Sequence, residues 1–189
     1  ERARTLLDEA GWSDTDGDGL RERDGESLRF RLLVQTGIAS LKKVAVLTQA
    51  YWEAIGVKAE IDLVEPTRFS LLAREHDFET ILWSFGANPK VDPSMEWRSD
   101  GQYNWFQYAN PAVDAKIDEG LYATDLAVAR EAFKEVQRLV HADQPVTFLY
   151  WQDGLIGIDK RFEGVEMNTF TLLHDVEDWY VPEGAQRYR

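Results

Sequence analysis

Apolar positions alternate between a helical and a strand period along the first part of the chain. Residues 3–10 carry apolar side chains at the spacing of one helix face, whereas residues 28–34 alternate as a half-buried strand does. Residues 41–55 return to a helical stripe behind Ser40, a predicted N-cap, and residues 57–63 alternate again. A strand, a helix and a strand within about forty residues fit a crossover unit with parallel strands, which predicts the α/β class.

The next elements are indicated by prolines and capping residues. Pro66 suits the first position of a helix, and the mostly apolar run 78–85 is short enough for a central strand. Asn110 stands before a proline and predicts a helix N-terminus, and a further helix is expected from about Thr124. We therefore expect a mixed sheet flanked by helices.

Two more strands are predicted near the end of the periodic region. Residues 146–151 and 155–158 are strongly apolar, and the polar residues 152–154 between them are typical of a tight turn. The stretch 86–93 contains two prolines and has no periodicity, so it predicts a long irregular connection.

Composition and charge exclude several classes of function. The 189 residues carry a net charge of −13, which repels nucleic acids and anionic lipids. The chain has no cysteine, so disulfides, thiolate nucleophiles and Cys-ligated metals are excluded. His76, His141 and His174 lack zinc-peptidase spacing, and neither a nucleophile elbow nor a phosphate-binding loop occurs. We therefore expect that the protein is not an enzyme.

An acidic loop has the spacing of a calcium-binding loop. Carboxylates occupy positions 1, 3 and 5 of the pattern, glycine occupies position 6, and a backbone carbonyl would serve at position 7. Position 12 is Gly25 where an EF-hand has glutamate, so closure has to come from Glu22, Asp24 or Glu26. A strand pattern follows, so the ion would be a structural Ca²⁺ and not a sensor. The alternative is an Asp-Gly turn whose carboxylates accept hydrogen bonds from nearby amides. The candidate ligands are Asp14, Asp16, Asp18, Leu20 and Asp24.

Aromatic residues gather between Trp83 and Tyr108, around the irregular connection that follows the predicted central strand. Ligands of open α/β sheets bind beyond the carboxyl ends of strands, and aromatic walls suit a peptide, a sugar or another small solute. Some of these rings are equally suited to the core, where we expect Phe106 and Tyr108.

Several motifs occur in the order found in one protein family. These are Leu-Asp-Glu-Ala-Gly-Trp (7–12), the acidic loop (14–21), Trp-Ser-Phe-Gly-Ala-Asn (83–88), Asn104-x-x-x-Tyr108-x-Asn110-Pro111-x-Val113-Asp114, Ala-Asp-Gln-Pro-Val-Thr-Phe-Leu-Tyr-Trp (142–151) and Lys-Arg-Phe-Glu-Gly-Val (160–165). The sequence resembles the C-terminal part of the family 5 extracellular solute-binding proteins, the peptide, oligosaccharide and nickel receptors of ABC importers.

The resemblance implies a type II periplasmic-binding-protein fold, in which two lobes close around a hinge over a small solute. Such receptors are longer than 189 residues, so the chain looks like a fragment of one. Residues 1–160 would be the second, ligand-binding lobe, and residues 161–189 would return toward the missing N-terminal lobe. The implied partners are a peptide or oligosaccharide and the ABC permease subunits. The implied location is extracytoplasmic, in the periplasm or anchored at the cell surface, and this chain shows no signal peptide.

The resemblance also indicates ligand-binding residues. In relatives that bind peptides, the strand exit reads Gly-Trp-x-Ala-Asp, and the aspartate pairs with the peptide amino group. Phe85 replaces that tryptophan, and Asn88 stands in the place of the aspartate. Because charge-assisted hydrogen bonds are about twice as strong as neutral ones, Asn88 favours a neutral solute over a free amine. The candidate ligand-binding residues are Trp83, Phe85, Gly86, Ala87, Asn88, Asp92, Trp97 and Trp105.

Two other functions are weighed against a solute receptor. The chain could be a stand-alone calcium-stabilised domain whose aromatic patch meets a protein partner. It could also be a glycoside hydrolase that uses Asp92 and Glu96, which requires carboxyl groups ~5–10 Å apart across one cleft.

Overall fold

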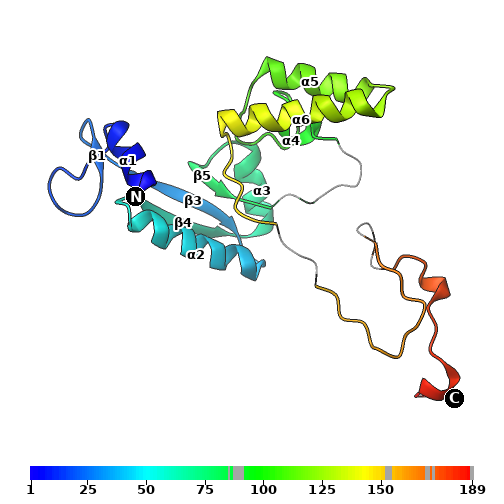
Figure 1. Ribbon diagram of the computed structural model, residues 1–189. Coiled ribbons are helices and arrows are strands. Elements are labelled where there is room, and N and C mark those ends of the chain that lie inside the picture. Colours follow the sequence, from blue (N-terminus) through cyan, green and yellow to red (C-terminus); the bar gives the residue numbers. More distant parts are fainter. Residues whose placement is uncertain (85, 87–91, 152–154, 169–170, 172, 188–189) are drawn as a thin grey trace. The chain divides into compact units, whose positions relative to one another are not determined.

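A computed structural model describes residues 1–84, 86, 92–151, 155–168, 171 and 173–187 (Figure 1). The chain divides into two compact units. The first comprises Glu1–Gly86 with Trp105–Gln107, and the second comprises Ala87–Asn104 with Tyr108–Arg189. Among the described residues, no helix has the length and apolar character needed to span a bilayer. The domain boundary expected at residue 160 stays a prediction.

The first unit is built on a parallel sheet of three strands. These are β3 (Arg29–Gln35), β4 (Lys58–Val64) and β5 (Thr80–Leu82), in the order β4-β3-β5. Both neighbours run parallel to β3, which pairs Leu32 with Ile61 on one side and with Thr80 on the other. Since successive side chains of a strand point to opposite faces, the burial of consecutive residues 32–34 means that both faces are covered. The prediction that the strand at 28–34 is only half-buried is therefore wrong for its second half, because the strand is central in the sheet. The α/β class is confirmed.

Three helices belong to this unit: α1 (Arg2–Glu9), α2 (Ala39–Glu53) and α3 (Pro66–Arg74). Leu41 and Ala45 of α2 pack against Leu32 and Val34 of β3. Pro66 is the first residue of α3, as predicted.

The prediction that Ser40 caps α2 is wrong. The helix begins one residue earlier, at Ala39, with Ile38 in the cap position and no side-chain cap bond. The Ile38 carbonyl accepts hydrogen bonds from the amides of Leu41 and Lys42, so Ser40 lies inside the first turn.

Antiparallel pairing in this unit occurs in a two-stranded ribbon of β1 (Glu22–Arg23) and β2 (Glu26–Ser27). Asp24 and Gly25 join the strands with φ of 56° and 83°. Positive φ at both central residues is typical of a tight hairpin turn, and it matches the preference of that turn for Asp-Gly.

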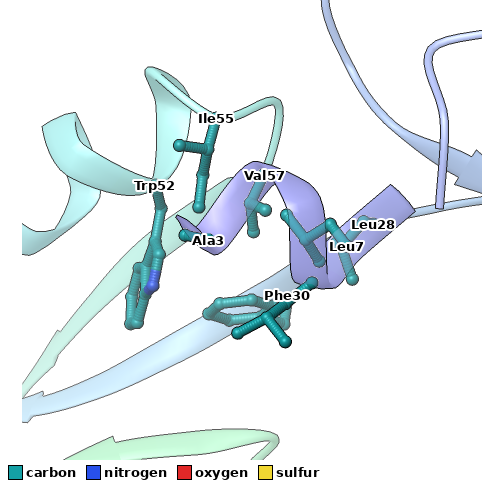
Figure 2. A pocket seen from close by; sticks show the side chains of 8 residues that line it. Ala3, Leu7, Leu28, Phe30, Trp52, Ile55 and Val57 are labelled. Atoms are coloured by element: carbon teal, nitrogen blue, oxygen red, sulfur yellow. The ribbon is translucent and has the colours of Figure 1, made fainter. Parts of the chain in front are cut away.

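An apolar pocket of about 370 Å³ lies between α1, the start of β3 and the end of α2 (Figure 2). Phe30 meets the Trp52 ring edge-on at 5.0 Å between centroids. The wall residues are Ala3, Leu6, Leu7, Leu28, Phe30, Trp52, Ile55 and Val57.

The second unit contains α4 (Ser94–Trp97), α5 (Pro111–Tyr122) and α6 (Leu126–Asp143). Its core is formed by Val113 and Ile117 of α5 against Val136 and Val140 of α6. Side chains cap both long helices: Asn110 accepts from the Ala112 amide at 2.9 Å, and Asp125 accepts from the Ala127 amide at 2.7 Å. The cap predicted at Asn110 is confirmed, and the last helix begins two residues after the expected Thr124.

Beyond α6 the described residues form two short 3₁₀ turns, η1 (Val176–Asp178) and η2 (Glu183–Ala185), and one bridge between Glu163 and Tyr180. The strands predicted at 146–151 and 155–158 are absent from this part of the structure, and the turn predicted at 152–154 lies outside the described residues. A strand needs a partner edge for its backbone hydrogen bonds, and no described residue supplies one here.

Candidate functional site

A pair of stacked tryptophans lies beyond the end of β5. Trp83 stacks on Trp105 with ring centroids 4.2 Å apart and an interplanar angle of 27°. Trp105 also contacts Phe69 of α3, and the two rings meet edge-on with their centroids 6.3 Å apart. The carbonyl oxygen of Trp105 lies 2.8 Å from Nδ1 of His76. Trp105 is 8% exposed, so it is a core residue that supports the more exposed Trp83.

The structure describes only part of the predicted ligand-binding set. Trp83, Gly86 and Trp105 belong to the first unit, and two of them form the stack. Phe85, Ala87 and Asn88 lie outside the described residues.

The other two candidates, Asp92 and Trp97, belong to the second unit. Asp92 Oδ1 accepts hydrogen bonds from the Ser94 amide at 3.1 Å and the Ser94 hydroxyl at 2.6 Å, and so holds the start of α4. Trp97 packs on the helical core and meets the rings of Tyr108 at 6.5 Å and Phe148 at 5.9 Å. Both residues therefore have structural contacts, whether or not a solute also reaches them.

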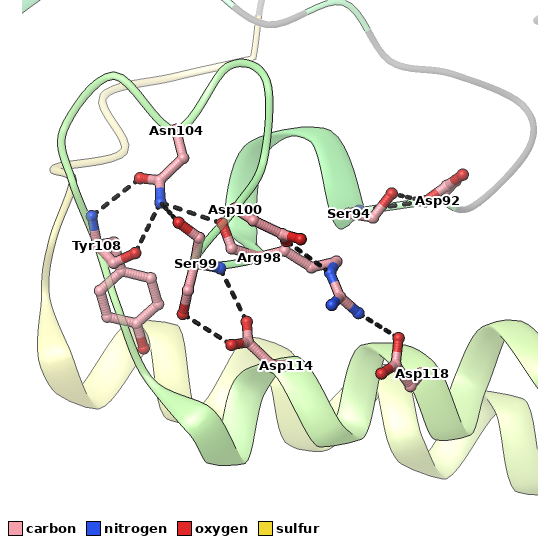
Figure 3. A network of polar contacts seen from close by, with 9 residues as sticks. All are labelled: Asp92, Ser94, Arg98, Ser99, Asp100, Asn104, Tyr108, Asp114 and Asp118. Carbon is pink, nitrogen blue, oxygen red and sulfur yellow. Dashed lines mark hydrogen bonds and ion pairs between the residues drawn. The ribbon is translucent and has the colours of Figure 1, made fainter.

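A buried asparagine organises the loop between α4 and α5 (Figure 3). Asn104 is 7% exposed, and its Nδ2 donates to the carbonyl oxygens of Arg98 at 3.1 Å, Ser99 at 3.4 Å and Tyr108 at 2.7 Å. Its Oδ1 accepts from the Tyr108 amide at 2.9 Å. One side chain thus joins both ends of the loop, which explains why asparagine stands at the head of the Asn104-to-Asp114 motif.

Carboxylates of α5 fasten the same loop to the helix. Asp114 accepts hydrogen bonds from the Ser99 amide at 2.8 Å and the Ser99 hydroxyl at 2.7 Å. Arg98 pairs with Asp100 at 2.9 Å and with Asp118. The sequence showed Asp114 only as a motif position, because the partners of a surface carboxylate depend on a loop path that periodicity does not define.

The carboxyl groups proposed for a hydrolase do not face each other from separate elements. Glu96 lies within α4, and Asp92 lies two residues before the helix, where it accepts a hydrogen bond from the Ser94 amide. Partial burial raises the pKa of Glu96, and the charge of Asp92 adds to the shift.

Tyr108 and Asn110 meet at the end of α6. The Tyr108 hydroxyl donates to Oδ2 of Asp143 at 2.6 Å, and Nδ2 of Asn110 donates to the same oxygen at 2.7 Å. These hydrogen bonds lower the pKa of Asp143. Burial, followed by the hydrogen bond to Asp143, raises the pKa of Tyr108 to about 12. Tyr108, which we expected in the core, is half-buried and packs against the α5–α6 cluster from its edge.

The raised pKa of Tyr108 predicts a pH dependence of stability. The folded pKa of about 12 exceeds the ordinary 10.0, so the contribution of Tyr108 is complete below pH 10 and is lost as the pH rises toward 12. We expect Tyr108→Phe to lose less stability than the wild type over that range, measured as the shift of the urea midpoint. Tyr122→Phe, at an 81% exposed position, is the control and should follow the wild type. Parallel curves for wild type and Tyr108→Phe would contradict the assignment.

The acidic loop of the first unit brings four carboxylates together. One oxygen from each of Asp14, Asp16, Asp18 and Glu22 lies within 4.8 Å of the others. Two of these carboxylates also accept hydrogen bonds from backbone amides. Asp14 accepts from the amides of Gly17 at 2.7 Å and Gly19 at 3.0 Å, and Asp18 accepts from the amide of Leu20 at 2.7 Å. Clustered like charges repel, and a bound cation would remove this repulsion.

Glu22, rather than Asp24, completes this group. Asp24 lies at the tip of the β1–β2 turn, whereas the Glu22 carboxylate is held toward the loop by the amide and hydroxyl of Thr15, at 2.9 and 3.0 Å. Among the three closures considered from the sequence, the geometry favours Glu22.

Arg21 connects the acidic loop to the rest of the unit. Its Nη1 donates to Asp8 of α1 at 2.5 Å and to the Trp12 carbonyl at 2.6 Å, and its Nε donates to the Ile55 carbonyl at 2.8 Å. The Arg21 side chain is only 12% exposed. An ion that ordered the loop would therefore stabilise the packing of α1 and the end of α2.

We expect Ca²⁺ to raise the melting temperature of the chain. At about 100 times its dissociation constant, a ligand of the folded state adds about 2.7 kcal/mol of stability. Glu22→Gln should reduce the shift, and Asp24→Asn, a matched neutralisation outside the group, should retain it. Differential scanning calorimetry with Ca²⁺ and with EDTA measures both. A melting temperature insensitive to Ca²⁺ would exclude the site. If only Asp24→Asn abolished the Ca²⁺-induced shift of the melting temperature, Asp24 rather than Glu22 would be the ligand.

Comparison with known proteins identifies the architecture as that of a bacterial extracellular solute-binding protein. The family model described as "Bacterial extracellular solute-binding proteins, family 5 Middle" matches residues 1–107. The chain therefore belongs to family 5 of these proteins.

Individual relatives cover most of the chain. The oligopeptide-binding protein AppA of Bacillus subtilis is 26% identical over 96% of the chain, and protein XP55 of Streptomyces lividans is 31% identical over 86% of it. The solved structure of AppA in complex with a nonapeptide superposes on 95% of the chain with a TM-score of 0.80 at 24% identity, which shows the shared fold. The chain spans about a third of the length of these relatives, 34% of AppA and 30% of XP55.

Proposed function

We propose that the chain is part of the substrate-binding component of an ABC importer, which captures an extracytoplasmic solute and delivers it to a membrane permease. The observation that carries the proposal is the family match over residues 1–107, extended by the likeness to AppA along 95% of the chain. The protein acts in the periplasm or anchored at the cell surface. The relative AppA, which is named as an oligopeptide-binding protein, supports binding without turnover.

The solute belongs to the oligopeptide or oligosaccharide class. Trp83, which is half-buried and stacks on the buried Trp105, would offer the solute an aromatic face beyond the carboxyl end of β5. Such a face suits a sugar ring or an apolar side chain. At position 88 an asparagine provides a neutral hydrogen-bonding group, so recognition does not depend on a charged amine. A relative from Thermotoga maritima with the same fold, at a TM-score of 0.69, was solved with mannohexaose bound.

Closure of two lobes over the solute is part of the proposal. This chain would supply the second lobe, and the remainder of the receptor would supply the first. The acidic loop would act as a structural Ca²⁺ clip remote from the solute in sequence, and the ion would take no part in recognition.

The test uses the receptor expressed from its complete reading frame. A pool of random peptides, the same pool after N-acetylation, and a pool of manno-oligosaccharides are incubated with it, and retained ligands are identified by mass spectrometry. We expect the receptor to retain either peptides or manno-oligosaccharides, and we expect the retained molecules to be intact. If peptides bind, the acetylated and the free peptides should be retained equally. A strong preference for free peptides would contradict neutral recognition at Asn88. Hydrolysed ligands, or no retention from any pool, would overturn the receptor proposal.

A further inference from the structure

The buried member of the aromatic pair, Trp105, comes from a short loop. It belongs to the first unit through residues 105–107, which form neither a helix nor a strand. The flanking residues Asn104 and Tyr108 are joined by two hydrogen bonds of 2.7 and 2.9 Å, so the loop is closed at its base (Figure 3). Because the loop has no regular structure of its own, the direction of the Trp105 ring depends on contacts with neighbouring residues.

One of these contacts is a hydrogen bond from His76, the residue that follows the C-cap of α3. Nδ1 of His76 lies 2.8 Å from the carbonyl oxygen of Trp105, and the two residues are 29 positions apart in the sequence. Because a carbonyl oxygen only accepts, Nδ1 carries the hydrogen and donates it. The carbonyl belongs to the residue whose ring stacks on Trp83, so the bond fixes the main chain directly beside the stack.

The backbone conformation of His76 is unusual for a histidine. Its φ is 56°, in the left-handed region. A helix that ends with such a residue usually has glycine there, and sometimes asparagine, because a β-carbon is unfavourable in this conformation. The histidine ring makes a contact with Trp105 that glycine could not make. An unfavourable backbone conformation that places a specific side chain is a reason to look for a functional role.

We propose that His76 is a positioning residue of the solute site, which holds Trp105 in the orientation that presents Trp83 to the solute. The proposal rests on the proposed function, because it takes Trp83 as a residue that contacts the solute. His76 acts through Trp105 and not through a contact of its own with the solute. A ring that is already fixed before binding favours affinity, since no side chain then has to be ordered by the solute.

Circular dichroism of the stacked indoles tests the positioning without any solute. Two closely stacked tryptophans give an exciton couplet, and Trp83→Phe identifies the couplet of this pair in the receptor expressed from its complete reading frame. His76→Gly removes the donor and suits the positive φ, so the receptor should remain folded and lose most of the couplet. His76→Asn should retain it, because asparagine tolerates this φ and carries an N–H donor as many bonds from the backbone as Nδ1 is.

Gln144→Gly is the matched control. Gln144 ends α6 with φ of 49°, and its side-chain amide donates to the His141 carbonyl at 2.5 Å, so it shares the backbone conformation and the kind of contact. It belongs to the second unit, and its replacement should leave the couplet unchanged. An unchanged couplet in His76→Gly would overturn the proposal. An equal loss in His76→Asn or in Gln144→Gly would overturn it as well.

Binding is measured separately, with the pools of N-acetylated peptides and of manno-oligosaccharides. For the pool that the wild-type receptor retains, His76→Gly should retain about 5-fold less, the change expected for the loss of one hydrogen bond. His76→Asn should retain as much as the wild type. Equal retention by His76→Gly and wild type would overturn the positioning role. A wild-type receptor that retains neither pool would overturn the proposed function, whereas the couplet alone decides whether His76 orients the pair.

Discussion

Replacing Phe69 by alanine should lower the free energy of unfolding of the first unit by about 3–5 kcal/mol, the range for a fully buried phenylalanine. Phe69 is 1% exposed in α3 and is the largest side chain among the most deeply buried residues. Its ring also meets Trp105 edge-on, and Trp105 in turn stacks on Trp83. The substitution therefore removes both buried apolar surface and the support behind the aromatic pair.

Urea unfolding followed by tryptophan fluorescence measures this effect, because two of the reporting tryptophans form the stack. Tyr51→Ala, at a 71% exposed position of α2, is the matched control and should change stability by no more than about 0.5 kcal/mol. In the complete receptor, the Phe69→Ala variant should also bind solute more weakly where it remains folded, since Trp83 loses its fixed orientation. If Phe69→Ala destabilised the chain less than Tyr51→Ala does, the aromatic stack would not be part of the core.

The parallel sheet could be predicted from the sequence because local signals agree there with the tertiary structure. Residues 28–34 and 57–63 alternate in sequence, and the intervening helix ends at Glu53, three residues before Gly56 with its φ of 82°. The connection brings the two strands together in parallel, as the rule for such crossover units predicts. Pro66 and Asn110 begin their helices where their chemistry predicts, because a proline at the first turn and an asparagine cap act through their own neighbouring residues.

Two local predictions, a strand and a helix cap, differ from the structure. Residues 146–151 have a clear strand pattern, yet pairing requires an edge that the described residues do not provide. Ser40 is a good capping residue by type, but the helix begins at Ala39, since the carbonyl of Ile38 starts its hydrogen-bond ladder. The strand prediction therefore failed for want of a distant partner, whereas the cap prediction failed by one residue because a neighbouring carbonyl begins the helix.

In the candidate site, too, some features could be predicted from the sequence and others could not. Trp83 was expected at a strand exit, and the structure brings it onto Trp105 across a gap in sequence that no periodicity connects. For the acidic loop, the three aspartates at alternate positions could be predicted as a group, whereas the closing residue could not. That choice depends on the β1–β2 turn, which turns Asp24 away and leaves Glu22 beside Thr15.

Asn104 is the residue of the second unit whose replacement we expect to have the largest effect. Asn104→Ala removes the donor to three carbonyl oxygens and the acceptor for the Tyr108 amide at a position that is 7% exposed. Each buried polar group left unsatisfied is destabilising by about 1–3 kcal/mol, and some of these groups will regain water, so we expect a total loss of about 2–4 kcal/mol. Asn104→Asp keeps the size but directs an acceptor at the carbonyl oxygens, so it should be no milder.

Asn110→Ala provides the graded comparison for this prediction. Asn110 caps α5 and bonds to Asp143 at the more exposed end of the same motif, so its loss should be about 1 kcal/mol, as for other N-caps. Urea unfolding followed by circular dichroism at the helical band measures the three variants against wild type. The expected order places both Asn104 variants below Asn110→Ala in stability, because burial, rather than the number of hydrogen bonds, determines what water can replace. The reverse order would mean that the α4–α5 loop opens readily to solvent. The loop would then be held mainly by its contacts with α5, which are Ser99 with Asp114 and Arg98 with Asp118.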